Sequence, residues 1–253
     1  MKLGSAALGQ YIKKSDPKAS TTEGPLNMLI HGEVGSGKTW CARTLEKYGP
    51  ILFLNLDQRR LSTFKDLPEG LVTEYRFGNT LDDPYSFQAA DSLVTTLAAE
   101  KGQEWGSIFT DTLTSLGIAA MNDVLEIAGR HGQFPFENDY GPQMSRIEHF
   151  VFMISAFPVK HFRVLTAHDN LVKDELTGSF MQTLLVTGQL KKRMPGFFDE
   201  VYFAERTGEG DKAKYQWITR QNRQTVARTQ IPGLEERIPQ DFNFVMEKFK
   251  ASS

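Results

Sequence analysis

Apolar runs recur along the middle of the chain at intervals that predict strands and helices in alternation. Short apolar runs predict buried strands at residues 26–30, 51–56, 72–77, 107–110 and 162–167. Between them, apolar residues with helical spacing predict helices at residues 86–100, 112–130 and 142–157. Strands that alternate with helices form mainly parallel sheets, because each crossover returns the chain to the same edge. The pattern therefore predicts an α/β domain whose sheet has helices on both faces.

The pattern changes near residue 200 and again near the N-terminus. Residues 200–206 and 212–220 alternate apolar and polar side chains around a Gly-Glu-Gly-Asp turn, which predicts an antiparallel hairpin at the end of the sheet. Residues 13–25 are polar and contain Pro, Gly, Ser and Thr, which is typical of a flexible lead-in. We therefore expect a flexible extension over residues 1–25, one folded domain over 26–245 and a short tail over 246–253.

Composition limits the classes of protein that fit. The 253 residues are 40% hydrophobic and 24% charged, enough for a sizeable core. The net charge of -2 excludes a chain that is basic all over, so any contact with nucleic acid needs a local patch. The one cysteine, Cys41, permits no internal disulfide, and no apolar run reaches membrane-spanning length. We expect a soluble, cytoplasmic protein without a membrane partner, in which Cys41 packs a helix.

The first candidate chemistry lies in the sequence GEVGSGKT at residues 32–39, which fits the phosphate-loop pattern G-x-x-x-x-G-K-[ST]. In this pattern, glycines let backbone N–H groups approach phosphate oxygens, Lys38 reaches the β and γ phosphates, and Thr39 binds Mg²⁺. A predicted strand precedes the loop, and a segment of helical composition at 39–48 follows it. We expect nucleotide contacts from Gly32, Glu33, Val34, Gly35, Ser36, Gly37, Lys38, Thr39 and Trp40.

A second signal is the apolar segment 105–111, which ends in Asp111. An Asp at a strand end can hold Mg²⁺ through water while Thr39 holds it directly, as in a Walker B arrangement. The interval after Lys38 has room for at least one further strand, so the Asp111 strand is not expected beside the phosphate-loop strand. This spacing and the absence of an Asn-Lys-x-Asp motif favour an ATPase over a GTPase or a small kinase, with ATP and Mg²⁺ as cofactors.

Hydrolysis of ATP needs a carboxylate that orients the attacking water. Asp111 is followed by Thr112 rather than by the Glu that many motor ATPases carry there. We therefore nominate Asp57, at the end of the predicted strand 51–56, as the catalytic acid. A solvated turn residue is the alternative interpretation of Asp57, and Glu33 is the next candidate.

His168 ends the predicted strand 162–167 and can sense the γ-phosphate, passing the difference between ATP and ADP to the segment that follows. A structural histidine at a strand end is the alternative.

Four segments together resemble the RecA-like core, in which the water-orienting acid and a polar sensor end successive strands: HGEVGSGKT (31–39), ILFLNLD (51–57), SIFTDTLTSLG (107–117) and RVLTAHD (163–169). Over roughly residues 26–245 the chain is similar to phage-encoded RecA-like ATPases of the AAA-domain or single-strand annealing type. The tail patterns at 188–202 and 225–230 belong to this resemblance.

The resemblance implies a RecA-like P-loop fold and a slow ATPase, stimulated by DNA or by assembly. It implies action on single-stranded DNA in phage-type recombination, as a ring or filament of identical subunits, with phage or host recombination proteins as possible partners in the host cytoplasm. It also implies that Arg228 of one subunit approaches the γ-phosphate of its neighbour. Arg223 is the second candidate for this role. The competing interpretation of Arg228 is a solvated arginine without a role in the site. Asp57 stands where RecA has Glu and His168 where RecA has Gln, which puts the turnover rate in question.

Two segments are candidates for contact with DNA. Residues 130–140 mix Arg, His and aromatic side chains, which suits stacked bases and paired phosphates, although Glu137 and Asp139 oppose it. Residues 170–193 contain Lys173 and the basic run 191–193. For each, an ordinary solvated connection is the alternative. A nucleotide-dependent switch or assembly ATPase acting on a protein partner is the competing function, and a small-molecule kinase would need an acceptor pocket and lid arginines that the sequence does not reveal.

Overall fold

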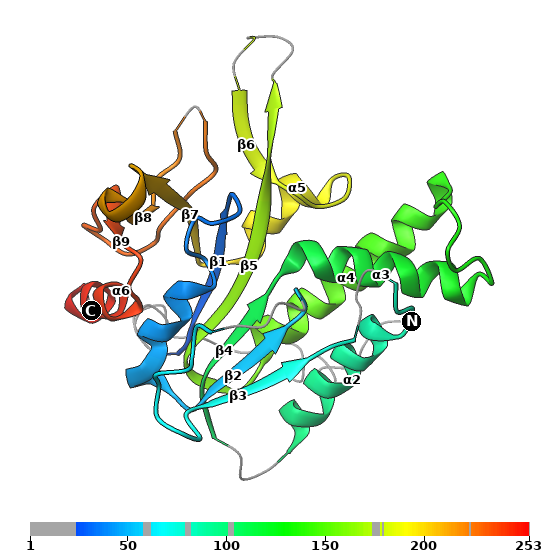
Figure 1. The fold of residues 1–253 in the computed structure, drawn as a ribbon, viewed down its shortest axis with the longest axis horizontal. Helices are drawn as coiled ribbons and strands as arrows, with labels where there is room; N and C mark the ends of the chain where they lie inside the picture. Colours follow the sequence, from blue (N-terminus) through cyan, green and yellow to red (C-terminus); the bar gives the residue numbers. More distant parts are fainter. Residues whose placement is uncertain are drawn as a thin grey trace, which may run out of the picture.

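A computed structural model describes residues 24–57, 62–78, 82–100, 104–173, 178, 180–222 and 224–252. Within these residues a central sheet lies between two layers of helices (Figure 1). The strands are β1 (Leu26–Gly32), β2 (Ile51–Asn55), β3 (Val72–Arg76), β4 (Trp105–Asp111), β5 (Val159–Lys173), β6 (Phe180–Leu184), β7 (Glu200–Thr207), β8 (Lys214–Ile218) and β9 (Arg237–Pro239).

The helical segments are of two kinds. The α-helices are α2 (Ser86–Ala99), α3 (Leu113–Ile127), α4 (Tyr140–Ala156), α5 (Leu190–Arg193) and α6 (Phe242–Ala251). The 3-10 helices are η1 (Trp40–Tyr48), η2 (Glu137–Asp139), η3 (Met194–Phe197) and η4 (Gly210–Lys212). The segment after the phosphate loop is thus helical, as expected, but in the tighter 3-10 form, and its buried Cys41 packs against the sheet.

The order of strands in the sheet is β3-β2-β4-β5-β1-β7-β8-β9 among the described residues. In this order, the six strands β3, β2, β4, β5, β1 and β7 pair in parallel. Strands β8 and β9 then pair in antiparallel fashion beyond β7. The predicted parallel sheet and its C-terminal hairpin are therefore confirmed. Strand β5 lies between β1 and β4, so the Asp111 strand is not a neighbour of the phosphate-loop strand, as the spacing indicated.

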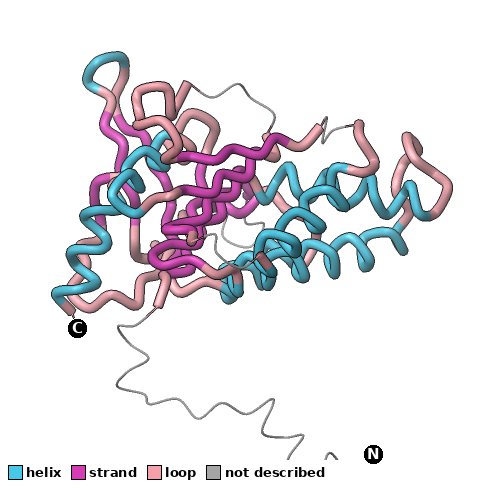
Figure 2. The backbone as a smooth tube through the Cα atoms, turned by 90° about the horizontal axis from the view of Figure 1, so that it is seen from below, coloured by secondary structure: helices cyan, strands magenta, loops and turns pink. Residues whose placement is uncertain are grey.

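Side chains of the buried strands alternate between two apolar cores. In β1, Leu29 belongs to the core that contains side chains of α2, α3 and α4. Met28 and Ile30 belong to the other core, which contains side chains of η1 and α6. This alternation follows from the two-residue period of a strand that is covered on both faces. Figure 2 shows the α2–α4 layer extending well beyond the sheet on one side, and the prediction of helices on both faces is confirmed.

The C-terminal helix corrects the expected domain boundary. Helix α6 runs across residue 245, and Phe242, Val245 and Met246 are buried in the second core. The Phe242 ring lies 5.2 Å from Trp217 and 5.1 Å from Phe162, centroid to centroid. Residues 246–251 are therefore part of the packed domain rather than a tail. Their apolar spacing is that of an amphipathic helix, because one face must cover the sheet. The expected flexible extension lies almost entirely outside the described residues.

The second expected DNA segment is not a plain connection. Strand β5 continues past the predicted end at residue 167 and pairs in antiparallel fashion with β6, from Asp169 opposite Leu184 to Lys173 opposite Phe180. The two strands form a ribbon that rises clear of the domain (Figure 1). We call these strands, residues 169–173 and 180–184, the β5–β6 ribbon. The helices α5 and η3 follow it.

Candidate nucleotide-binding site

The phosphate loop leaves β1 at Gly32 and closes at the start of η1, and two of its glycines are required by close packing. A Cβ atom at Gly32 would lie 2.5 Å from the carbonyl oxygen of Ala204. A Cβ atom at Gly37, whose φ is +92°, would lie 2.4 Å from Oε1 of Gln240 and 2.9 Å from the Tyr215 ring. All three contacts are shorter than a Cβ atom tolerates, and the positive φ of Gly37 disfavours a side chain there as well. The loop backbone therefore has the exposed, glycine-lined form that a phosphate cradle needs.

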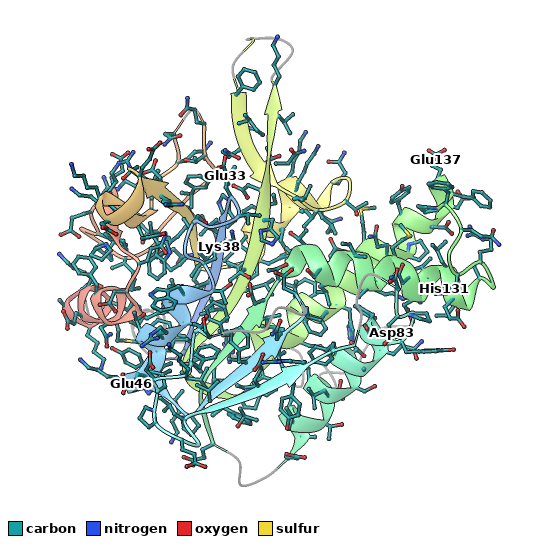
Figure 3. The ribbon with its side chains drawn as sticks, viewed as in Figure 1. Glu33, Lys38, Glu46, Asp83, His131 and Glu137 are labelled. Carbon is teal, nitrogen blue, oxygen red and sulfur yellow. The ribbon has the colours of Figure 1, made fainter. Side chains whose placement is uncertain are left out.

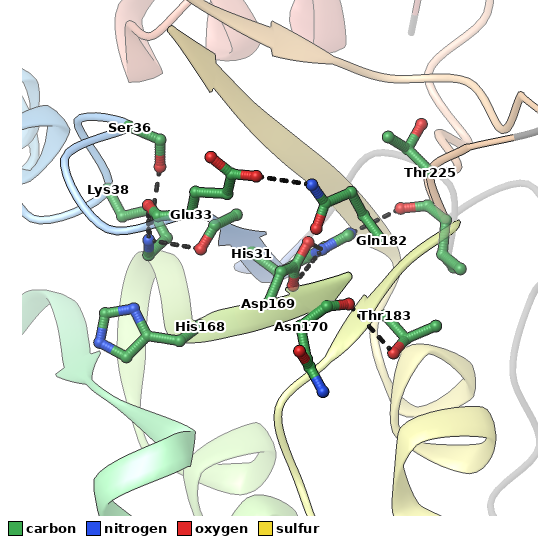
Figure 4. Close-up of polar contacts among 12 residues, drawn as sticks. His31, Glu33, Ser36, Lys38, His168, Asp169, Asn170, Gln182, Thr183 and Thr225 are labelled. Carbon is green, nitrogen blue, oxygen red and sulfur yellow. Dashed lines mark hydrogen bonds and ion pairs between the residues drawn. The ribbon is translucent and has the colours of Figure 1, made fainter. Parts of the chain in front are cut away.

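Lys38 lies buried inside the loop (Figure 3). Its Nζ donates to the carbonyl oxygens of Gly32 and Glu33, each at 2.7 Å, and to Oγ of Ser36 at 3.3 Å (Figure 4). These bonds hold the ammonium group at the centre of the loop. A phosphate group bound there would meet a fixed positive charge.

Asp111 and Thr39 meet although 72 residues separate them. The Thr39 hydroxyl donates to Oδ2 of Asp111 at 2.7 Å, and the Thr166 hydroxyl donates to Oδ1. Burial raises the pKa of Asp111, while the hydrogen bonds from Thr166 and Thr39 lower that pKa. The nearby charge of Asp57 raises the Asp111 pKa further and that of Lys38 lowers it. Hydroxyl and carboxylate oxygens are the ligands that Mg²⁺ prefers.

A cavity of about 580 Å³ opens beside the loop, a volume in the usual range for a small-molecule site. Its walls come from the loop, from the ends of β2 and β5 and from the C-terminal part of the chain: Gly35, Ser36, Gly37, Lys38, Thr39, Trp40, Asp57, Thr63, His168, Tyr215 and Gln240. The structure thus brings Asp57 and His168 to the phosphate loop. The roles assigned to these residues stay predictions.

The first turn of α3 positions both strand-end candidates. Ser115 Oγ donates to Oδ1 of Asp57 at 3.0 Å. Thr114 Oγ1 accepts a hydrogen bond of 3.0 Å from the backbone N–H of His168. Thr112 caps the helix by accepting from the Ser115 N–H at 3.2 Å. Because α3 begins directly after Asp111, one junction contacts Asp57, Asp111 and the backbone of His168, which lies within β5 rather than at its end.

Contacts that the sequence analysis missed attach the loop to the β5–β6 ribbon (Figure 4). His31, just before the loop, is buried with its Nδ1 2.9 Å from both carboxylate oxygens of Asp169. Its Nε2 lies 2.6 Å from the carbonyl oxygen of Val226. Within the loop, Oε1 of Glu33 accepts from Nε2 of Gln182 in β6 at 2.7 Å. The only sequence signal for these contacts was the position of His31 and Asp169 next to residues already singled out.

Arg228 does not line the cavity of its own chain. Its backbone pairs with Val201 of β7, and its guanidinium group donates to the carbonyl oxygen of Phe198. Phe198 precedes β7, whereas the phosphate loop lies at the opposite, carboxyl end of the parallel strands. A contribution of Arg228 to a neighbouring subunit stays a prediction. The alternate, Arg223, lies outside the described residues.

The first DNA candidate segment lies at the tip of the helical layer, where Figure 3 shows His131 and Glu137 far from Lys38. Arg130 pairs with Asp139 at 2.5 Å and lies 4.3 Å over the Phe136 ring. Phe134 is 91% exposed, the largest exposure among the described bulky apolar side chains.

The basic run 191–193 lies on α5. Arg193 there pairs with Glu148 at 2.9 Å, whereas Lys191 and Lys192 are exposed. The local basic charge available to DNA is therefore small. Across the described part of the chain, no helix is both long enough and apolar enough to traverse a lipid bilayer.

The sheet order, the phosphate loop and the strand-end acids define a RecA-like P-loop ATPase fold. The chain belongs to the AAA domain family, which matches residues 24–231. Among curated proteins, none matches the chain in sequence.

Similar solved structures include an ATPase from the type III secretion system of pathogenic bacteria, at 15% identity and a TM-score of 0.51, covering 71% of this chain and 52% of that one. The flagellar accessory protein FlaH from Methanocaldococcus jannaschii has 12% identity and a TM-score of 0.47, covering 90% of this chain and 92% of that one. The KaiC-like protein PH0186 from Pyrococcus horikoshii OT3 has 14% identity and a TM-score of 0.42, covering 81% and 82%. This chain spans about half of the secretion ATPase, and at such identity the likeness shows the fold alone.

Proposed function

We propose that this protein binds ATP with Mg²⁺ in the cavity beside the phosphate loop and hydrolyses it. The observation that carries the proposal is the contact of Thr39 with Asp111 at 2.7 Å beside the buried ammonium group of Lys38. A hydroxyl, a carboxylate and a cation held together at a glycine cradle are the groups that phosphate and Mg²⁺ require.

Each residue has a distinct part in this proposal. Lys38 would hold the β and γ phosphates, and Thr39 and Asp111 would hold Mg²⁺, which neutralises charge on the phosphate oxygens. Asp57 would orient the attacking water and accept its proton, with Ser115 fixing the carboxylate. His168 would contact the γ-phosphate. The cavity volume fits a nucleoside triphosphate, as does the absence of space for a side chain at Gly32 and Gly37.

Binding measurements with variants test the site. Lys38→Ala should abolish ATP binding in calorimetry, because the loop has no other cation to meet the phosphates. Asp111→Asn should bind ATP with a weaker dependence on Mg²⁺ and retain the wild-type circular dichroism spectrum. Lys47→Ala is the matched control, since Lys47 is exposed at the far end of η1 and does not line the cavity. Wild-type ATP affinity in Lys38→Ala would refute the assignment.

Single-stranded DNA is the effector that we propose for the ATP-bound protein, in phage-type recombination or annealing. Support comes from the exposed Phe134 and Phe136 beside Arg130, which could stack bases, and from the exposed Lys191 and Lys192.

A protein partner is the second candidate effector, in which case the chain is an assembly ATPase or switch. The β5–β6 ribbon favours this candidate. Leu171 and Phe180 are exposed on one face of the ribbon, and Val172 and Met181 are exposed on the other. The contact of Gln182 with Glu33 ties the ribbon to the phosphate loop.

A further inference from the structure

Part of the cavity wall has no role in holding phosphate or Mg²⁺. Trp40 follows the loop, Tyr215 lies on β8, and Gln240 lies between β9 and α6. The last two approach the loop at Gly37, where they leave no room for a side chain. The antiparallel end of the sheet and the start of α6 thus close the cavity next to the phosphate cradle.

The two aromatic rings are exposed at this wall, and an arginine side chain lies near each of them. Trp40 is 58% exposed and Tyr215 is 44% exposed, although both line the cavity. The Arg43 guanidinium carbon lies 4.6 Å from the Trp40 ring centroid, and that of Arg206 lies 5.9 Å from the Tyr215 centroid. Arg43 is itself held by the Thr63 carbonyl oxygen at 3.0 Å. Aromatic side chains have only two rotatable bonds, so these rings offer a planar group a stacking surface at little entropic cost.

Gln240 adds a directional polar group. Its Nε2 donates to the carbonyl oxygen of Ser36 at 2.8 Å and to that of Gln216 at 3.1 Å. A primary amide has two N–H donors, so both are committed, and Oε1 can only accept. An acceptor matches the exocyclic amino group of adenine or cytosine. It does not match the carbonyl oxygen that guanine or uracil carries at the corresponding position.

We propose that Trp40, Tyr215 and Gln240 form the base subsite of the cavity, with the rings stacking the base and Gln240 selecting adenine and cytosine, which carry an amino group where guanine and uracil carry a carbonyl oxygen. The inference rests on the proposed nucleotide site and adds a preference for ATP over GTP. It also gives the antiparallel hairpin a function, because β8 brings Tyr215 to the cavity.

Affinities for ATP, GTP, CTP, UTP and inorganic tripolyphosphate, measured by calorimetry with Mg²⁺, test the base subsite. Tyr215→Ala should weaken ATP binding about 10-fold to 100-fold, the scale of one lost stacking contact. Its tripolyphosphate affinity should stay within about twofold of wild type, because the phosphate cradle is unchanged. Tyr215→Phe keeps the ring and should bind ATP as the wild type does. Tyr85→Ala is the matched control, an exposed tyrosine that does not line the cavity.

The preference among the four nucleoside triphosphates tests the selecting role of Gln240. The wild type should bind ATP and CTP more tightly than GTP and UTP, and Gln240→Leu should reduce that preference about tenfold. An unchanged ATP affinity in Tyr215→Ala, or an equal loss of ATP and tripolyphosphate affinity, would overturn the stacking role. An unchanged ATP-to-GTP ratio in Gln240→Leu would overturn the selecting role. A wild type that binds tripolyphosphate and ATP equally well refutes the base subsite alone, whereas one that binds neither refutes the nucleotide site as well.

Discussion

Neighbouring side chains orient the carboxylate of Asp111 and stabilise its anionic form. Thr39 and Thr166 each donate a hydroxyl hydrogen bond to one of its oxygens, so both oxygens are oriented within a buried site. Burial alone would favour the protonated carboxyl, because a charge is poorly solvated there, and the two hydrogen bonds oppose this effect by stabilising the anion. A bound Mg²⁺ would act in the same direction as the hydroxyls.

The Asp57→Asn variant is expected to separate ATP hydrolysis from ATP binding. Asp57→Asn keeps the size of the side chain and an oxygen that can accept from Ser115, but its amide cannot take a proton from water. We expect single-turnover ATP hydrolysis to fall by about 10²-fold or more while the ATP dissociation constant stays near wild type. Asp211→Asn is the matched control, since Asp211 is exposed and does not line the cavity.

Other outcomes at Asp57 have definite meanings. An equal loss of binding and hydrolysis would make Asp57 a structural residue. Full hydrolysis in Asp57→Asn would move the catalytic assignment to Glu33, whose carboxylate accepts a hydrogen bond from Gln182.

At the scale of elements, β5 is the strand that connects the cavity to the exterior. It carries His168 at the cavity and Asp169 against His31, and then continues into the ribbon. The phosphate loop contacts the same ribbon through Glu33 and Gln182. Two contacts therefore link the nucleotide site to the exposed β5–β6 ribbon, and a change in the loop has a short route to it.

This linkage predicts that ATP alters hydrogen exchange in the ribbon. In the wild type, backbone amides of β6 should exchange at rates that differ about fivefold or more with and without ATP, the low end of typical coupling between sites. Gln182→Ala should reduce that difference because Glu33 loses its partner. Thr183→Ala is the control, since the Thr183 hydroxyl bonds within the ribbon to the Asn170 carbonyl oxygen. An ATP effect of equal size in Gln182→Ala would show that the contact carries no coupling.

At the scale of the whole molecule, the two candidate effector surfaces are separate. The ribbon extends from β5 next to the phosphate loop, whereas residues 130–140 lie at the tip of the helical layer (Figures 1 and 3). The ribbon carries one basic side chain, that of Lys173, and the basic run on α5 is short. Contact with DNA would therefore depend on aromatic stacking with few phosphate contacts.

We expect a labelled single-stranded oligonucleotide to bind in the presence of an ATP analogue more tightly than with ADP. The logarithm of its affinity should fall with the logarithm of salt concentration by about 0.7 for each phosphate contact. Phe134→Ala should weaken binding about tenfold through the loss of one stacked base. Tyr85→Ala is the control, an exposed aromatic residue on another part of the helical layer. No binding at low salt with either nucleotide would exclude DNA and leave the protein partner as the effector.

Features that depend only on contiguous residues could be predicted from the sequence alone. The phosphate cradle occupies residues 32–39, and the alternation of strands and helices follows from local periodicity. The parallel sheet, its antiparallel end and the position of Asp111 at a strand end followed from the same local rules. The helix over 242–251 also has a readable apolar spacing, although the predicted tail over 246–253 included its second half.

Features that depend on strand order were decided by the tertiary structure. Placing β5 between β1 and β4 brings Thr166 to Asp111 and Asp169 to His31, and it sets His168 opposite Gly32. Adding β8 and β9 beyond β7 brings Tyr215 and Gln240 to Gly37. No local sequence pattern predicts these contacts, because the contacting residues come from separate strands. Only the order in which the strands pair across the sheet decides which residues reach the cavity.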